Sequence, residues 1–171
     1  MNAIYYSWAK IHEMVDVLAN QITNSPVKVN HIYGVLRGGL IPSVLLSHKL
    51  EIPMTTSWLP NTLIVDDIVD SGETLKLLST TAKVNNYLTP AMTAVLFRRH
   101  STGFEPDFYG EILDNDSWIV YPWENVDKTE EEYETYRARR ERVPIAKDAP
   151  KNFPRILPFV PQKSHLKPET T

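Results

Sequence analysis

The chain has 171 residues, no cysteine and a net charge of −3 at pH 7. Its hydrophobic content of 42% and charged content of 23% are ordinary for a globular protein, and its length suits one domain with a sizeable core. The acidic balance argues against a nucleic-acid-binding surface, and the lack of cysteine excludes disulfides and thiolate metal sites. No apolar run approaches the roughly 20 residues that span a bilayer. We therefore expect a cytoplasmic protein without a membrane segment or a signal peptide.

The first segment carries apolar side chains at helical spacing, which predicts an amphipathic helix over residues 4–22. The apolar stripe consists of Ile4, Trp8, Ile11, Val15, Leu18 and Ile22. Ser7 is a residue type that caps the start of a regular helix. His12 lies among polar neighbours, so we expect its side chain to be solvated.

A glycine turn separates a predicted strand over residues 29–36 from a predicted helix over residues 41–50, which has Pro42 in its first turn. The turn is Arg37-Gly38-Gly39. Glycines let backbone amides approach an anion, and Arg37 adds positive charge. Taken alone, such a turn is more often an ordinary connection than a phosphate loop.

The most informative stretch begins with the apolar run Leu63-Ile64-Val65, which is typical of a strand buried on both faces of a parallel sheet. Four acidic residues follow within eight positions, namely Asp66, Asp67, Asp70 and Glu73. Crowded carboxylates raise one another's pKa unless a cation lies among them. Mg²⁺ held by one or two carboxylates together with substrate oxygens is the simplest solution.

The same stretch leads into a predicted helix over residues 73–84. A helix N-terminus at the carboxyl edge of a parallel sheet offers unpaired N–H groups and a partial positive charge, which suit a phosphate group. The alternative is an acidic turn before an ordinary helix cap. That alternative leaves two adjacent aspartates after a buried strand unexplained.

Between these two motifs, residues 51–61 are enough for one strand, over residues 54–58, and a turn. After them we expect strands over residues 92–97 and 107–113. The first of these ends in Arg98-Arg99-His100, where we expect Arg98 to form a surface ion pair.

Aromatic residues at positions 118, 121 and 123 favour a packed core over a platform for a base when composition alone is considered. Residues 128–142 then predict a charged, solvated helix. Residues 144–171 hold six of the 13 prolines and show no periodic pattern, which predicts an extended tail.

Three segments together resemble type I phosphoribosyltransferases. Val65 to Thr74 resembles, over ten consecutive positions, the motif of that family that binds phosphoribosyl pyrophosphate (PRPP). Gly34 to Pro42 resembles the pyrophosphate loop, and Asp116 to Trp123 resembles the hood of xanthine–guanine phosphoribosyltransferases. The resemblance extends from residue 7 to about residue 125.

The resemblance implies an α/β fold with a central, mainly parallel sheet flanked by helices. It implies a phosphoribosyltransferase domain over residues 1–127, with a core of about 29–113 and a hood from the N-terminal segment and 114–127. Residues 128–171 are then a C-terminal extension of charged helix and proline-rich tail. In the family the peptide between the residues matching Arg37 and Gly38 is often cis. The family also has a long mobile loop before the acidic motif, so residues 51–61 make this lid short or absent.

The implied activity is that of a Mg²⁺-dependent pentosyltransferase of purine salvage. It moves 5-phosphoribose from PRPP to a 6-oxopurine and releases pyrophosphate. The residues that match the PRPP site are Arg37, Gly38, Asp66, Asp67, Asp70, Ser71, Gly72, Glu73 and Thr74. Among them, Asp66 and Asp67 match the groups that grip the ribose hydroxyls, directly or through Mg²⁺. Asp70 matches the catalytic group that removes or shares a purine proton.

The base site implied by the resemblance comprises Arg99, Trp118 and Ile119. Arg99 stands where purine-specific members have a lysine, and Trp118 matches the residue that stacks on the purine. Partners are then PRPP, a purine base and further copies of the chain in a dimer or tetramer. Two alternatives stay open: a catalytically weak relative that binds PRPP or a nucleotide as a signal, and, less well supported, a Mg²⁺-dependent phosphohydrolase.

Overall fold

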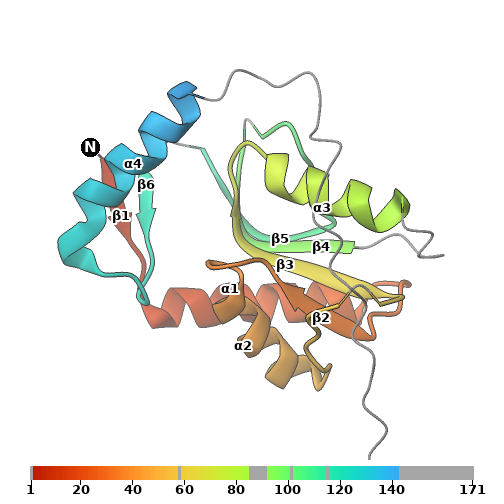
Figure 1. Cartoon of the computed structure of the whole chain (residues 1–171). Coiled ribbons are helices and arrows are strands. Elements are labelled where there is room, and N and C mark those ends of the chain that lie inside the picture. Colours follow the sequence, from red (N-terminus) through yellow and green to blue (C-terminus); the bar gives the residue numbers. More distant parts are fainter. Residues whose placement is uncertain (1, 58, 85–91, 101, 115, 143–171) are drawn as a thin grey trace, which may run out of the picture.

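The structure is a computed structural model that describes residues 2–57, 59–84, 92–100, 102–114 and 116–142. Within these residues the chain forms a four-stranded sheet, a separate two-stranded sheet and four α-helices (Figure 1). No helix in these ranges is both long and apolar enough to cross a membrane. The tail predicted over residues 144–171 lies outside the described residues, whereas the charged helix predicted before it lies within them.

The larger sheet has the order β2-β3-β4-β5 and is parallel throughout. Its strands are β2 (His31–Gly34), β3 (Thr62–Val69), β4 (Met92–Arg99) and β5 (Phe108–Leu113). Leu63, Ile64 and Val65 are fully buried in β3, which confirms the predicted strand. The α/β fold with a central parallel sheet is therefore confirmed.

Helices cover both faces of this sheet. Helices α1 (Trp8–Thr23) and α2 (Leu40–Leu50) lie on one face and α3 (Glu73–Val84) lies on the other (Figure 1). Successive side chains of a strand point to opposite faces, so Leu63 and Val65 join the core under α1 and α2 while Ile64 joins the core under α3. This double burial is why β3 needs an uninterrupted apolar run.

The smaller sheet joins the beginning of the chain to a segment more than 100 residues later. Strand β1 (Ala3–Tyr5) pairs in parallel with β6 (Trp118–Val120), with Ala3 opposite Trp118. The predicted start of the first helix at residue 4 is therefore wrong, because these backbone groups are used in a sheet. The predicted cap is confirmed, since the Ser7 hydroxyl accepts a hydrogen bond from the Lys10 N–H at 3.3 Å.

Two other local predictions are corrected. Within the described part of the chain, residues 54–58 form no strand. Met54 makes an isolated bridge to Ile32, because the hydrogen bonds of Pro53 and Thr55 with Ile32 are not followed by a further bridge to β2. The cis peptide of the glycine turn joins Leu36 to Arg37, one residue earlier than the resemblance implies.

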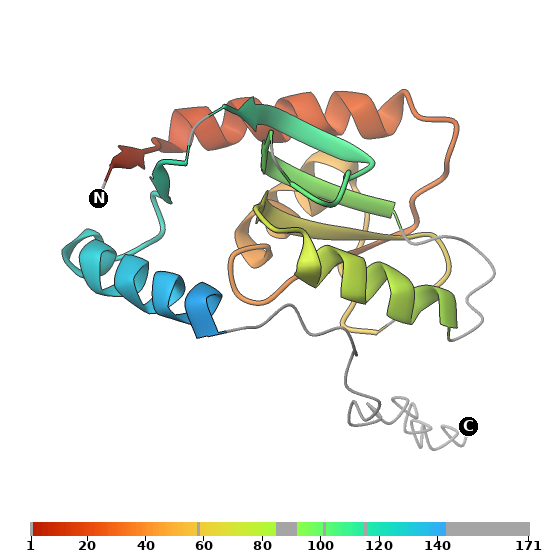
Figure 2. The ribbon, with the colours of Figure 1, turned by 90° about the horizontal axis from the view of Figure 1, so that it is seen from above.

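After β6 the chain turns through a short 3₁₀ helix, η1 (Val126–Lys128), into α4 (Thr129–Arg142). Helix α4 lies at the end of the molecule that carries the small sheet (Figure 2). The charged helix predicted over residues 128–142 is confirmed.

Packing between α1 and the large sheet gives a test of the fold. A Cβ atom at Gly110 would lie 2.5 Å from the Leu96 carbonyl oxygen and 2.9 Å from Met14 Sδ. We expect Gly110→Ala to lower the free energy of unfolding by about 1–3 kcal/mol, measured by denaturant titration, because backbone or helix must shift. Gly103→Ala is the control, since its nearest new neighbour is the Ser71 carbonyl oxygen at 3.7 Å. Equal stability of the two variants would contradict this packing.

Candidate functional site

The polar residues gather where β3 and β4 end. Asp66 and Asp67 lie in the last part of β3, Asp70 follows it, and Arg99 is the last residue of β4. Because the two strands are parallel and adjacent, their carboxyl ends share one edge of the sheet. Open α/β sheets bind ligands at this edge.

The paired aspartates are half-buried. Burial, followed by the charge of Asp67, raises the pKa of Asp66 from 3.8 to about 8. Burial also raises the pKa of Asp67. One oxygen of each carboxylate accepts a backbone N–H: Asp66 Oδ1 from Asp67 at 3.0 Å and Asp67 Oδ1 from Ile68 at 2.8 Å. A positive charge beside the pair would therefore be strongly favoured.

This donor set fits Mg²⁺ in composition. Among the described residues, no group of three or more His, Cys, Asp or Glu side chains comes together as a metal cage. Mg²⁺ bound together with a phosphorylated substrate usually takes only one or two carboxylates from the protein. Asp66 and Asp67 supply two, and burial raises the pKa of both carboxyl groups, so a cation beside them would stabilise the anionic forms. Binding of the metal there stays a prediction.

The glycine turn lies directly against this pair. A Cβ atom at Gly38 would overlap the carboxylate of Asp67, and one at Gly39 would overlap the Val65 carbonyl oxygen. Both positions therefore need glycine for close approach of the backbone rather than for an unusual φ angle. The side chain of Arg37, in the same turn, is exposed to solvent. Positive charge can thus reach a ligand lying over Asp66 and Asp67.

The turn between β3 and α3 is open on its outer side. Gly72 has a φ of 80°, which favours glycine, and the back of the turn is filled by Phe104. Ser71, Glu73 and Thr74 are exposed, and Ser71 Oγ accepts the Glu73 N–H at 3.4 Å. The first turn of α3 thus faces solvent at the same edge as the aspartates, as an anion site requires.

A cavity of about 200 Å³, here called the inner cavity, adjoins the aspartates. It is lined by Asp67, Ile68, Asp70, Arg99, Trp118, Ile119, Tyr121, Glu124 and Tyr136. A more open cavity of about 450 Å³, here called the outer cavity, is lined by Asp70, Arg99, Asp116, Trp118, Tyr133, Tyr136 and Arg137. The structure therefore brings together one of the paired aspartates, Asp70 and all three predicted base-site residues.

Arg99 is fixed between three parts of the chain. Only 9% of the residue is exposed; its Nε donates to Asp70 Oδ1 at 2.9 Å and its Nη2 donates to the Ser117 carbonyl oxygen at 2.8 Å. The guanidinium of β4 thus joins the end of β3 to the start of β6. Arg98 points to the other face, where it pairs with Glu105 and lies over the Tyr109 ring, which confirms its predicted ion pair.

Trp118 is packed against α4. Its ring centroid lies 5.6 Å from that of Tyr133 and 5.1 Å from that of Tyr136. The prediction of a solvated helix is therefore wrong for this face of α4. Tyr121 and Trp123 stack at 4.6 Å, with Tyr121 buried, which confirms their place in the core.

Sequence reasoning missed four residues of the inner cavity, namely Ile68, Tyr121, Glu124 and Tyr136, of which Tyr121 was assigned to the core alone. Ile68 lies at an apolar position of the acidic motif and belongs to β3 in the structure. Glu124 accepts the Tyr121 N–H at 2.9 Å, and burial raises the pKa of its carboxyl group. Tyr136 had a usable signal, because it lies three residues after Tyr133 and so shares a helix face with it.

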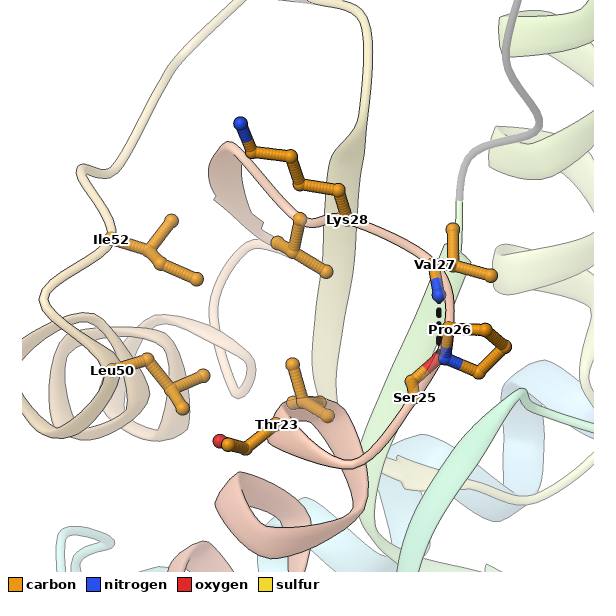
Figure 3. Close-up of a pocket in the computed structure, with 9 residues that line it drawn as sticks. Thr23, Ser25, Pro26, Val27, Lys28, Leu50 and Ile52 are labelled. Carbon is orange, nitrogen blue, oxygen red and sulfur yellow. Dashed lines mark hydrogen bonds between the residues drawn. The ribbon is translucent and has the colours of Figure 1, made fainter.

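A third hollow, of about 350 Å³, lies far from this edge, between the end of α1 and the end of α2 (Figure 3). Its lining includes Thr23 and Leu50, the last residues of α1 and α2, and Ser25, Lys28 and Ile52 on the segments that follow these helices. Only one charged side chain, Lys28, lines it. It lies at the amino end of β2 and offers no set of groups for chemistry.

Comparison with known proteins gives consistent relatives, although no family model matches the chain. The xanthine-guanine phosphoribosyltransferase of Cereibacter sphaeroides is 28% identical over 165 residues, covering 79% of this chain and 93% of that protein. The crystal structure of a purine phosphoribosyltransferase from Pyrococcus horikoshii is 30% identical with a TM-score of 0.65, covering 73% of this chain and 95% of the other. The xanthine-guanine-hypoxanthine phosphoribosyltransferase of Helicobacter pylori shares the fold, with a TM-score of 0.63 and 22% identity, over 77% of this chain and 99% of the other.

The burial of Asp66 predicts an unusual pH dependence of stability. Its folded-state pKa of about 8 is above the ordinary value of 3.8, so the folded protein holds the proton more tightly than the unfolded chain does. This contribution is complete below about pH 4 and is lost as the pH rises to about 8. In magnesium-free buffer, Asp66→Asn should therefore flatten the fall in unfolding free energy over that range, measured by denaturant titration at several pH values. The exposed Asp114→Asn is the control, and an unchanged slope in Asp66→Asn would refute the prediction.

Proposed function

The chain belongs to the type I phosphoribosyltransferase family, and on that premise we propose that it transfers 5-phosphoribose from PRPP to a 6-oxopurine. The products are the nucleoside monophosphate and pyrophosphate, as in purine salvage. One observation carries the proposal: the inner cavity joins Asp67 and Asp70 of the PRPP motif to Arg99 and Trp118. A sugar held at the aspartates and a base held at Trp118 would therefore meet.

The sugar phosphate has matching groups along β3 and the turn that follows it. The exposed first turn of α3 would hold the 5′-phosphate through its N–H groups and the hydroxyls of Ser71 and Thr74. Asp66 and Asp67 would hold the ribose hydroxyls and Mg²⁺, with Arg37 and Gly38 receiving pyrophosphate. Bound Mg²⁺ would neutralise negative charge on the leaving group.

The base would lie in the inner cavity, with Trp118 against its face. Arg99 would donate to the exocyclic oxygen, and the backbone of Ile119 would meet the edge of the ring. In the reaction the bond between C1 and the pyrophosphate oxygen breaks as a purine nitrogen bonds to C1. The proton on that nitrogen passes to Asp70, which lines both cavities.

A second candidate function is a regulatory protein that binds PRPP or a nucleotide with little turnover. The described part of residues 51–61 makes only an isolated bridge to β2, without the long loop that excludes water in an efficient transferase. Asp70 is also engaged by Arg99. Both observations are compatible with a site that binds more readily than it reacts.

Incubation of the protein with PRPP, Mg²⁺ and guanine, xanthine or hypoxanthine distinguishes these functions. Formation of the nucleoside monophosphate, followed by chromatography, supports the transferase. Nucleotide binding without product assigns the regulatory function. Release of phosphate from PRPP or a nucleotide in the absence of a base would instead indicate a hydrolase.

Asp70→Asn tests the proton acceptor, because it keeps the shape of the side chain and removes its charge. General base catalysis contributes about 10²–10⁴-fold, so we expect kcat to fall at least about 100-fold. The dissociation constant for the nucleoside monophosphate, measured by calorimetry, should change far less. Equal losses in turnover and binding would mean that Asp70 serves to hold Arg99 and does not accept the proton.

Trp118→Ala tests the base platform. Loss of one stacking contact is worth about 1–3 kcal/mol, so the KM for the purine should rise roughly 5- to 150-fold. The KM for PRPP should stay close to that of the wild type, because the phosphate groups bind on other segments. If only the thermal stability changes, Trp118 belongs to the core and not to the site.

A further inference from the structure

We infer that α4 is part of the base site and that Tyr136 forms one wall of the pocket that holds the purine. The inference deepens the proposed function, because it assigns a base-contacting residue to a helix outside the segment that resembles the family. On the side of the base, α4 would then cover the ligand, as a lid does in the family; the corresponding loop here, residues 51–61, is short.

Tyr136 lies at the junction of the two cavities. It lines both of them, as do Asp70, Arg99 and Trp118. Its ring centroid is 5.1 Å from that of Trp118, with the two planes inclined at 53°. A flat ligand that reaches Trp118, Asp70 and Arg99 in the inner cavity therefore also meets the Tyr136 side chain.

The turn after β6 places α4 at the site. The Glu124 N–H donates to the Tyr121 carbonyl at 3.0 Å, and the Glu124 carboxylate accepts the Tyr121 N–H at 2.9 Å. This tight turn reverses the chain, and Asn125 caps η1 before α4 begins. Helix α4 then runs back beside β6, with its C-terminal end directed toward the side of the large sheet that carries α3 (Figures 1 and 2).

The aromatic residues of α4 lie on the helix face that lines the cavities. Positions 129, 133 and 136 lie on one helix face, and this face carries the buried Thr129 and the two tyrosines. Glu131, Glu134 and Thr135, at other positions, are exposed. Tyr133 and Tyr136, the two aromatic residues of α4, therefore both lie on the face that packs against Trp118.

The chemistry of Tyr136 suits a purine. An aromatic ring offers an apolar face to the base, and a phenol keeps one polar atom for the rim of the pocket. Stacking on such rings is effective for every base, because each base has an extended π-face. The simpler explanation is that both tyrosines only pin α4 to Trp118. A comparison with Tyr133 distinguishes the two explanations. The ring centroid of Tyr133 lies 5.6 Å from that of Trp118, but Tyr133 lines only the outer of these two cavities.

The test compares the affinity of the full-length protein and its variants for GMP by isothermal titration calorimetry, which requires no turnover. For Tyr136→Ala we expect roughly tenfold weaker binding, the loss of about one stacking contact. Tyr136→Phe should restore the affinity, because the ring is retained. Tyr133→Ala should lower thermal stability and leave the affinity near that of the wild type, and the exposed Thr135→Ala should change neither. Where turnover is measurable, Tyr136→Ala should raise the KM for guanine and leave that for PRPP unchanged.

Each result decides the inference. Unchanged GMP affinity in Tyr136→Ala, or equal loss in Tyr136→Ala and Tyr133→Ala, would show that the tyrosines only anchor the helix. No GMP binding by the wild type would reject both this inference and the proposed function. Binding of GMP without any nucleotide synthesis would reject the transfer reaction alone, and the comparison of the four variants would still decide the role of Tyr136.

Discussion

The candidate site depends on two adjacent carboxylates that directly follow the buried apolar run of β3. Leu63 to Val65 commit β3 to the centre of the sheet, and the strand carries Asp66 and Asp67 straight from that apolar interior to the ligand edge. Burial then raises the pKa of both side chains. Near neutral pH the chain gains nothing in stability from this arrangement, because desolvation opposes the charged forms. The arrangement is reasonable where a cation and a polyhydroxylated ligand complete the site.

The rest of the site connects segments that are far apart along the chain. Arg99 donates to Asp70 and to Ser117, so one side chain joins the ends of two strands to the small sheet. In the small sheet β1 pairs with β6, and the ring of Trp118 in β6 packs against Tyr136 of α4. The turn between β3 and α3 uses none of these contacts, since it is built around Gly72 with Phe104 behind it. In the proposed complex, base and sugar phosphate would thus have separate supports that meet at Asp70.

Local patterns in the sequence predicted most of the large sheet and the acidic motif. The apolar run of β3, the glycine turn and the start of α3 are encoded by neighbouring residues, which is why their positions were correct. The pairing of β1 with β6 depends on residues separated by more than 100 positions, so helical spacing at Ile4 was misleading. The contact of α4 with Trp118 was missed because the many charged residues of α4 predicted a solvated helix. The two tyrosines on one face of α4 were not considered as a packing face. The resemblance assigned Arg99 and Asp70 to one site, but the bonds of Arg99 to Asp70 and to Ser117 were not predicted.

The fixed guanidinium also has a consequence for selectivity. Arginine donates hydrogen bonds and cannot accept them, and at this site its orientation is set by Asp70 and Ser117. A base whose six-position bears an exocyclic amine, as in adenine, would bring one donor against another, and the buried groups on both sides would lose their partners. Polar mismatch of this kind discriminates far more strongly than a small difference in shape. If the proposed function holds, this one buried side chain would therefore favour keto over amino nucleobases.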